Sequence, residues 1–261
     1  IAVIQTLKTK IMKKTTFISS GLFALAFIMF SGFICNDPHG NMLRDNTDKT
    51  LVNEIADDIP VEEFNSVAIA LDARVFIEQG NEHSLEIETS SETLDKIEVK
   101  VKDGKLVIKP ENYTSRLKDD IRIYIVAPDY ETISLAGSGE LFAEKKMELE
   151  DTELKLAGSG SMFFEDLSAD ELELKISGSG EVNIKGEGAE EMDISIAGSG
   201  DVDCGDFPVE ELHAKIGGSG DCKVWVNGEI NASIAGSGSI HYKGNPQIDS
   251  SVAGSGRVKS L

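Results

Sequence analysis

Residues 192–202 read Met-Asp-Ile-Ser-Ile-Ala-Gly-Ser-Gly-Asp-Val, and versions of this stretch recur through the second half of the chain. Gly-Ser-Gly occurs seven times, at spacings of 21, 20, 20, 20, 18 and 18 residues. A period near 20 residues is typical of a solenoid, in which each repeat stacks on its neighbours. The outer glycines of the seven motifs are Gly137, Gly139, Gly158, Gly160, Gly178, Gly180, Gly198, Gly200, Gly218, Gly220, Gly236, Gly238, Gly254 and Gly256.

The residues around each motif predict two strands in every repeat. Before the third motif, Leu172, Leu174 and Ile176 alternate with polar residues, and a period of two indicates a strand with one buried face. A second short apolar alternation follows each motif, as in Val182–Ile184. Gly-Ser-Gly is therefore expected to form the corner between two strands. Glycine suits a corner because it reaches positive φ and lets neighbouring corners stack closely.

Two topologies are compatible with these strands, a β-solenoid and an antiparallel meander. The position two residues before each motif is always Leu, Ile or Val, and the next is always small. Stacking of equivalent residues in parallel ladders requires such columns, whereas a meander does not. We therefore predict an all-β fold: a single-stranded parallel β-helix, expected to be right-handed, with 18–21 residues per coil over residues 137–261. Charged outward positions exclude an outer-membrane barrel.

Residues 61–136 lack the corner motif but keep the strand pattern, which predicts irregular N-terminal β coils or a cap that covers the end of the solenoid. Asp103-Gly104 is a signal for a two-residue hairpin. The candidate strands are Val67–Ile77, Ser84–Thr89, Ile97–Val101, Lys105–Lys109 and Ile121–Val126.

Residues 1–35 are predicted to be an export signal. Met12-Lys13-Lys14 before an apolar run has the form of a secretory signal, and Met12 is the expected true start. Cys35 ends a stretch that resembles a lipobox, so we expect it to be lipidated, although Gly32 and Ile34 depart from the usual pattern. Cleavage with release and an uncleaved anchor are the alternatives. All three place the remaining chain outside the cytoplasm.

Charge and composition restrict the partners of the exported part. Residues 36–60 are polar, without sustained apolar periodicity, and are predicted to be a tether. The chain carries 46 acidic and 25 basic residues, a net charge of −21. A nucleic-acid partner is excluded on this ground, because phosphate backbones are bound through Lys and Arg. The membrane is expected to be contacted only through the N-terminal anchor.

Several stretches resemble one protein family in combination. They are Phe64–Val67, Val75–Gly80, Asp103–Ile108 and the repeated Ala-Gly-Ser-Gly. Residues 61–256 are on this basis similar to the auto-transporter adhesin head GIN domain family, which is common in exported proteins of Bacteroidetes. The resemblance implies a β-helical exported domain and a role in adhesion. It implies no catalytic, cofactor or ligand residues, and no cofactor is expected.

The position after the corner offers a candidate metal site. Glu181, Asp201 and Asp221 would form a column of carboxylates in a solenoid. Such a column is destabilising unless it is solvated or bridged by a cation, and its oxygens are the ligands that Ca²⁺ prefers. The alternative is a solvated acidic face without a metal, and this alternative is favoured.

Four further groups of residues are candidates for binding or catalysis. Cys204 and Cys222 share the inward parity on adjacent coils and are expected to be two buried thiols, with a disulfide as the alternative. Trp225, Phe163 and His241 are predicted to face outward, where they would contact a partner or a sugar, or pack at a corner. Lys155 and Lys175 share a column, but His213 and His241 show no matching acid spacing. No catalytic residue is therefore assigned.

These observations predict an exported cell-envelope binding module that resembles an adhesin and lacks catalysis, with a glycan or protein as its unidentified surface ligand. A structural or stress-related lipoprotein facing the periplasm is the first alternative, and a carbohydrate-active β-helix enzyme is the second. Location at the outer membrane or cell surface as a lipoprotein is expected. Periplasmic location or an uncleaved anchor remain alternatives.

Overall fold

The computed structural model describes residues 54–112, 117 and 119–261. Within these ranges it contains β-strands and a single helical turn, α2 (Ser91–Leu94). The predicted all-β solenoid is confirmed. Predictions that concern Met12, Cys35 and most of the tether lie outside the described residues. In the described chain, no helix is long and apolar enough to cross a membrane.

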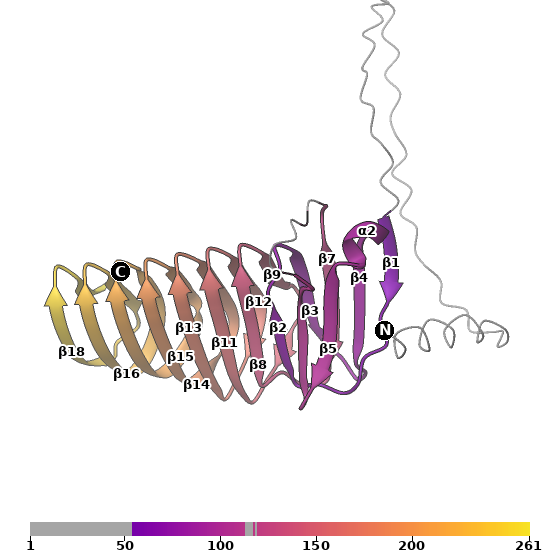
Figure 1. Cartoon of the computed structure of the whole chain (residues 1–261). Helices are drawn as coiled ribbons and strands as arrows, with labels where there is room; N and C mark the ends of the chain where they lie inside the picture. Colours follow the sequence, from indigo (N-terminus) through magenta and orange to yellow (C-terminus); the bar gives the residue numbers. More distant parts are fainter. Residues whose placement is uncertain (1–53, 113–116, 118) are drawn as a thin grey trace, which may run out of the picture. The chain divides into compact units, whose positions relative to one another are not determined.

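The strands before the corners form one continuous parallel ladder, seen edge to edge in Figure 1. Its partners are equivalent residues of successive coils: Ile176 pairs with Ile196, and Ile196 pairs with Ile216. This register is the one that distinguishes a solenoid from a meander. The strands are β8 (Thr132–Gly137), β11 (Asp151–Gly158), β13 (Glu171–Gly178), the second halves of β14 (Glu181–Gly198), β15 (Asp201–Gly218) and β16 (Cys222–Gly236), and β18 (Gln247–Gly254).

The strands after the corners form a second parallel ladder. Here Met162 pairs with Val182, and Val182 pairs with Val202. The strands are β9 (Glu140–Ala143), β12 (Ser161–Ser168), the first halves of β14, β15 and β16, β17 (Ser239–Lys243) and β19 (Arg257–Ser260). A short third side completes each early coil, where β10 (Met147–Glu148) pairs with Leu167 and Ser168. We name the two long ladders the pre-corner sheet and the post-corner sheet.

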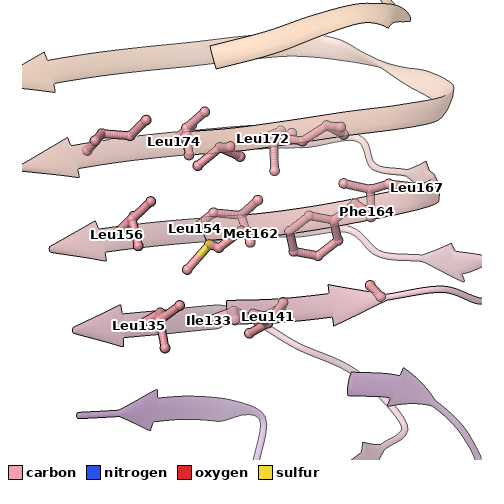
Figure 2. Packing of buried hydrophobic residues seen from close by; sticks show 14 of the residues in the cluster. Ile133, Leu135, Leu141, Leu154, Leu156, Met162, Phe164, Leu167, Leu172 and Leu174 are labelled. Atoms are coloured by element: carbon pink, nitrogen blue, oxygen red, sulfur yellow. The ribbon is translucent and has the colours of Figure 1, made fainter. Parts of the chain in front are cut away.

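The core lies between these two sheets. Figure 2 shows Leu154, Leu156, Leu172 and Leu174 of the pre-corner sheet facing the same interior as Phe164 of the post-corner sheet. All five side chains are at most 1% exposed. Because the alternation repeats in every coil, each inward residue stacks on its equivalent above and below, and the interior is a continuous apolar column.

The chain before β8 extends both sheets without the repeat. The pre-corner sheet continues from β8 through β2, β6 and β5, and the post-corner sheet continues from β9 through β3, β7, β4 and β1. The β5–β6, β7–β4 and β4–β1 pairs are antiparallel. The strands are β1 (Glu54–Asp58), β2 (Ser66–Ile69), β3 (Arg74–Gln79), β4 (Ser84–Ser90), β5 (Ile97–Lys102), β6 (Lys105–Pro110) and β7 (Arg122–Ala127).

The predictions for this mixed sheet are confirmed except at one place. Asp103 and Gly104 have φ of +51° and +74°, as a type I′ turn requires, and they join β5 to β6. The single strand predicted over Val67–Ile77 is wrong, because Leu71–Ala73 bends the chain into β2 and β3. These three residues form a corner beneath Gly137, so residues 66–79 are a coil whose corner contains no glycine.

Candidate binding surfaces

The Gly-Ser-Gly corners are held by contacts between backbones. The first glycine of each motif has φ between +116° and +141°, a region that other residues rarely occupy. A Cβ added to Gly198 would lie 2.2 Å from the carbonyl oxygen of Gly178. The middle serine is exposed in all seven motifs, and each serine from the second motif onward donates its backbone N–H to the preceding coil at 2.8–2.9 Å. The corners therefore present a ridge of small, uncharged side chains.

The candidate calcium column is engaged in hydrogen bonds between coils. Glu181 pairs with Asp201 in the ladder. The Asp201 carboxylate accepts the Asp221 backbone N–H at 2.9 Å, and the Asp221 carboxylate accepts the Ser239 backbone N–H at 2.8 Å. Among the described residues, no group of three His, Cys, Asp or Glu side chains has the arrangement of a metal site. Asp201 and Asp221 thus connect successive coils.

A groove of about 630 Å³ lies on the outward face of the pre-corner sheet, where it meets the third side. Six of its nine acidic residues form two adjacent columns, Asp151, Glu171 and Glu191 in one, Glu153, Glu173 and Asp193 in the other; Asp129, Glu131 and Glu150 also line it. Neighbouring Asp151 and Glu191 raise the pKa of Glu171 above its ordinary value, because each negative charge opposes ionisation of the next. The groove is strongly acidic and open to solvent.

The lysines beside this groove are paired with its acids. Lys175 Nζ lies 2.8 Å from Glu153 Oε1 and 2.6 Å from Glu173 Oε1, and Lys155 also contacts Glu153. These bonds raise the pKa of Lys175 above its ordinary value, so it stays a cation. His213 Nε2 lies 3.2 Å from Glu211 Oε1 on the same sheet, whereas His241 lies on the post-corner sheet. The fold therefore does not bring the two histidines together.

The outward face of the post-corner sheet carries an aromatic column. Tyr124, Phe76, Phe142 and Phe163 stack in that order, with ring centroids 5.1, 5.5 and 5.3 Å apart and planes within 22° of parallel. Phe163 faces outward but is half-buried. Each inner ring uses both faces against its neighbours, so the column presents ring edges. The arrangement favours packing over stacking on a sugar.

Trp225 and the cysteines also lie where the alternation predicts. Trp225 is half-buried, and Lys243 Nζ lies 4.4 Å from its ring centroid. Cys204 and Cys222 are free and buried, as predicted. Cys222 pairs with Val202 and Cys204 pairs with Val224, and both valines are buried inward residues. The two cysteines are thus offset by two residues along the ladder. Burial raises the pKa of each thiol well above its usual range.

Sequence reasoning missed the acidic groove and the aromatic column for different reasons. Once the repeats are aligned, the groove is visible in the sequence as pairs of acids two residues apart. These pairs lie at positions 151 and 153, 171 and 173, and 191 and 193. The aromatic column needs the pairing of β3 with β7 and β9, and no repeat in the sequence indicates that pairing.

Two stacked parallel ladders, glycine corners and solvent-open outward faces define a β-solenoid domain. The chain belongs to the family described as "putative auto-transporter adhesin, head GIN domain", whose model matches residues 63–246. Membership implies an exported protein. No curated protein matches the chain.

Solved structures have the same fold. A "putative adhesin" from Bacteroides fragilis NCTC 9343 matches with a TM-score of 0.75 and 25% identity, over 80% of this chain and 97% of that one. A "putative lipid binding protein" from Parabacteroides distasonis ATCC 8503 has a TM-score of 0.69 and 23% identity, with the same coverage. A "putative adhesin" from Parabacteroides merdae ATCC 43184 has a TM-score of 0.65 and 22% identity, over 80% and 96%.

Proposed function

We propose that this protein is a cell-envelope binding module that holds a ligand on the outward face of its solenoid without catalysing a reaction. The observation that carries the proposal is the open acidic groove of the pre-corner sheet, built from strand residues in fixed register. Such an array suits recognition because its side chains are positioned by the backbone ladder before any ligand binds. Family membership supports an adhesin-like role.

The chemistry of the groove favours a ligand with positive charge. Complementary charge steers association and selects against wrong partners. A protein segment or glycan that carries ammonium groups satisfies this condition, whereas an anionic polymer does not. The lysines flanking the groove are already bonded to Glu153 and Glu173, so they leave the other carboxylates to face the ligand.

We further propose that Cys35 is lipidated and anchors the domain to the outer membrane, with the solenoid on the outside of the cell. Protease shaving of intact cells tests the location. Digestion of the solenoid on intact cells supports the surface position. Complete protection, with digestion only after lysis, would instead indicate the periplasm-facing alternative.

Capture of glycans, envelope proteins and vesicles by the full chain in detergent tests binding. The vesicles are included because one structural neighbour is named for lipid binding. Glu171→Lys should reduce capture about tenfold, since it reverses a charge at the centre of the groove. Glu82→Lys is the matched control, because Glu82 is exposed in the connection between β3 and β4 and the charge change is identical. Equal capture by both variants would remove the groove from the proposal.

A further inference from the structure

The last coil exposes residues that every inner coil buries. Ile248 and Val252 of β18 are 42% and 40% exposed, whereas their ladder partners Ile230 and Ile234 are at most 1% exposed. All eight residues of β18 are exposed. Within the described chain, β18 pairs only with β16, so its other edge presents free backbone N–H and C=O groups. Figure 1 shows β18 at the end of the row of strands.

The four edges of the pre-corner and post-corner sheets differ in their protection. Natural edge strands avoid pairing with other chains through charges, prolines or bulges. β1 ends in Asp57-Asp58, β5 carries Lys100 and Lys102, and β19 carries Arg257 and Lys259. β18 reads Gln-Ile-Asp-Ser-Ser-Val-Ala-Gly and has one charge, no proline and no shift of register against β16. It is the unprotected edge of the four.

We propose that two copies of this chain pair through β18, edge to edge and antiparallel, about a two-fold axis at Ser250. The axis runs perpendicular to the sheet, so inward side chains of one copy stay inward in the other. Ile248 of each copy then lies opposite Val252 of the other, and the two Ser250 residues lie opposite each other. Apolar pairs of this kind stabilise antiparallel edges, and the pairing covers the exposed ends of both cores.

The charges at the last coil permit a second copy at β18 and limit how far the pairing extends. The only charge on β18 is Asp249, and in this register it faces Ser251 of the second copy, so no like charges are opposed. On the post-corner sheet, the edge strand β19 of each copy carries Arg257 and Lys259, so extending the pairing to this sheet would bring like charges together. Their repulsion confines pairing to β18. Because both chains are strongly acidic, the dimer should tighten as salt rises.

Cross-linking of Ser250→Cys in the full chain, in detergent under mild oxidation, tests the pairing. Opposed residues of antiparallel strands have Cα atoms about 4.5–5.5 Å apart, which a disulfide can bridge. We expect a covalent dimer on a non-reducing gel, with more dimer at 0.5 M than at 0.05 M salt. The parent chain measures any contribution of Cys35. Ser255→Cys, at the exposed corner of the same coil, should stay monomeric.

A second variant keeps the test independent of folding. Val252→Lys adds a charge to an already exposed edge position, so the coil should remain folded while dimerisation of the Ser250→Cys chain falls at least tenfold. Three results overturn the proposal: a Ser250→Cys chain that stays monomeric while its thiol reacts freely with maleimide, a stronger cross-link for Ser251→Cys, or a cross-link to a different protein.

Discussion

The mixed sheet before β8 and the coils after it build the same two ladders in different ways. In the pre-corner sheet of the coils, each strand pairs with residues 18–21 positions away, and one register repeats to β18. In the mixed sheet, β2 pairs with β6 and β8, while β3 pairs with β7 and β9, so the coil 66–79 lies between coils that follow it in sequence.

The two regions obtain their stability from different contacts. The coils depend on identical backbone contacts at every corner, so a single side chain at a corner obstructs the stack. The mixed sheet depends on individual hairpins and on the buried Tyr130, whose hydroxyl donates to the carbonyl oxygen of Glu78 at 2.7 Å. The two ends differ as well: the antiparallel strand β5 covers the edge of β6, whereas no described strand covers the outer edge of β18.

The largest effect is expected from a corner glycine. In Gly198→Ala, alanine would have to adopt a φ of +130°, and its Cβ would lie 2.2 Å from the Gly178 carbonyl oxygen. We therefore expect the free energy of unfolding to fall by about 4 kcal/mol or more. Gly104→Ala in the mixed-sheet hairpin should cost only about 1 kcal/mol, because its nearest neighbour is the Asn65 side chain at 3.3 Å. Urea unfolding followed by circular dichroism measures both.

Gly217→Ala is the internal control for this experiment. Its added Cβ would meet nothing nearer than the Ile196 carbonyl oxygen at 3.8 Å, and alanine already occupies this column in five coils. We expect a change of at most about 0.5 kcal/mol. A loss at Gly217 equal to that at Gly198 would contradict the role assigned to the corner backbone.

Intermediate effects should separate the two ends. Ile108 in β6 is fully buried, and β5 pairs with the outer edge of its strand. Ile108→Ala should therefore lower the free energy of unfolding by about 2–5 kcal/mol. Ile248→Ala, in the uncovered β18, should cost about 1 kcal/mol or less. Measuring Ile248→Ala in the Val252→Lys background removes any contribution from pairing through β18. Equal losses would mean that the last coil is covered in solution.

The smallest effect is a difference in alkaline sensitivity. Burial raises the pKa of the Cys204 and Cys222 thiols and of the Tyr130 hydroxyl, so all three are protonated in the fold. A group whose pKa is raised by folding contributes its full stabilisation below its pKa in the unfolded chain, and this stabilisation falls as the pH rises above that pKa. The pKa in the unfolded chain is about 8.5 for a thiol and about 10 for tyrosine. The coils should therefore weaken before the mixed sheet.

Replacing both thiols tests this order. The Cys204→Val, Cys222→Val chain should lose the decline between about pH 8.5 and 10, worth up to about 1.4 kcal/mol per pH unit for each thiol. Valine suits both sites because each cysteine pairs with a valine in the ladder. Denaturation midpoints from pH 7 to 10.5 measure the slope. An unchanged slope would show that the thiols ionise alike in both states.

The repeating coils can be predicted from the amino-acid sequence alone. Gly-Ser-Gly every 18–21 residues, with Leu, Ile or Val two positions before it, is enough to predict the ladder register, because each repeat meets a copy of itself. The Asp103-Gly104 hairpin and the burial of Cys204 and Cys222 follow from equally local rules of backbone conformation and alternation.

Features that depend on pairing between dissimilar, sequence-distant segments require the three-dimensional structure. The coil at Leu71–Ala73 has no glycine motif, and the aromatic column requires β3 to enter between β7 and β9. The acidic groove needs three coils in register, and the exposed edge of β18 is recognised only when the pairing of the described strands is known. Local pattern specifies which face of a strand is buried, whereas pairing between dissimilar segments is decided by packing of the whole fold.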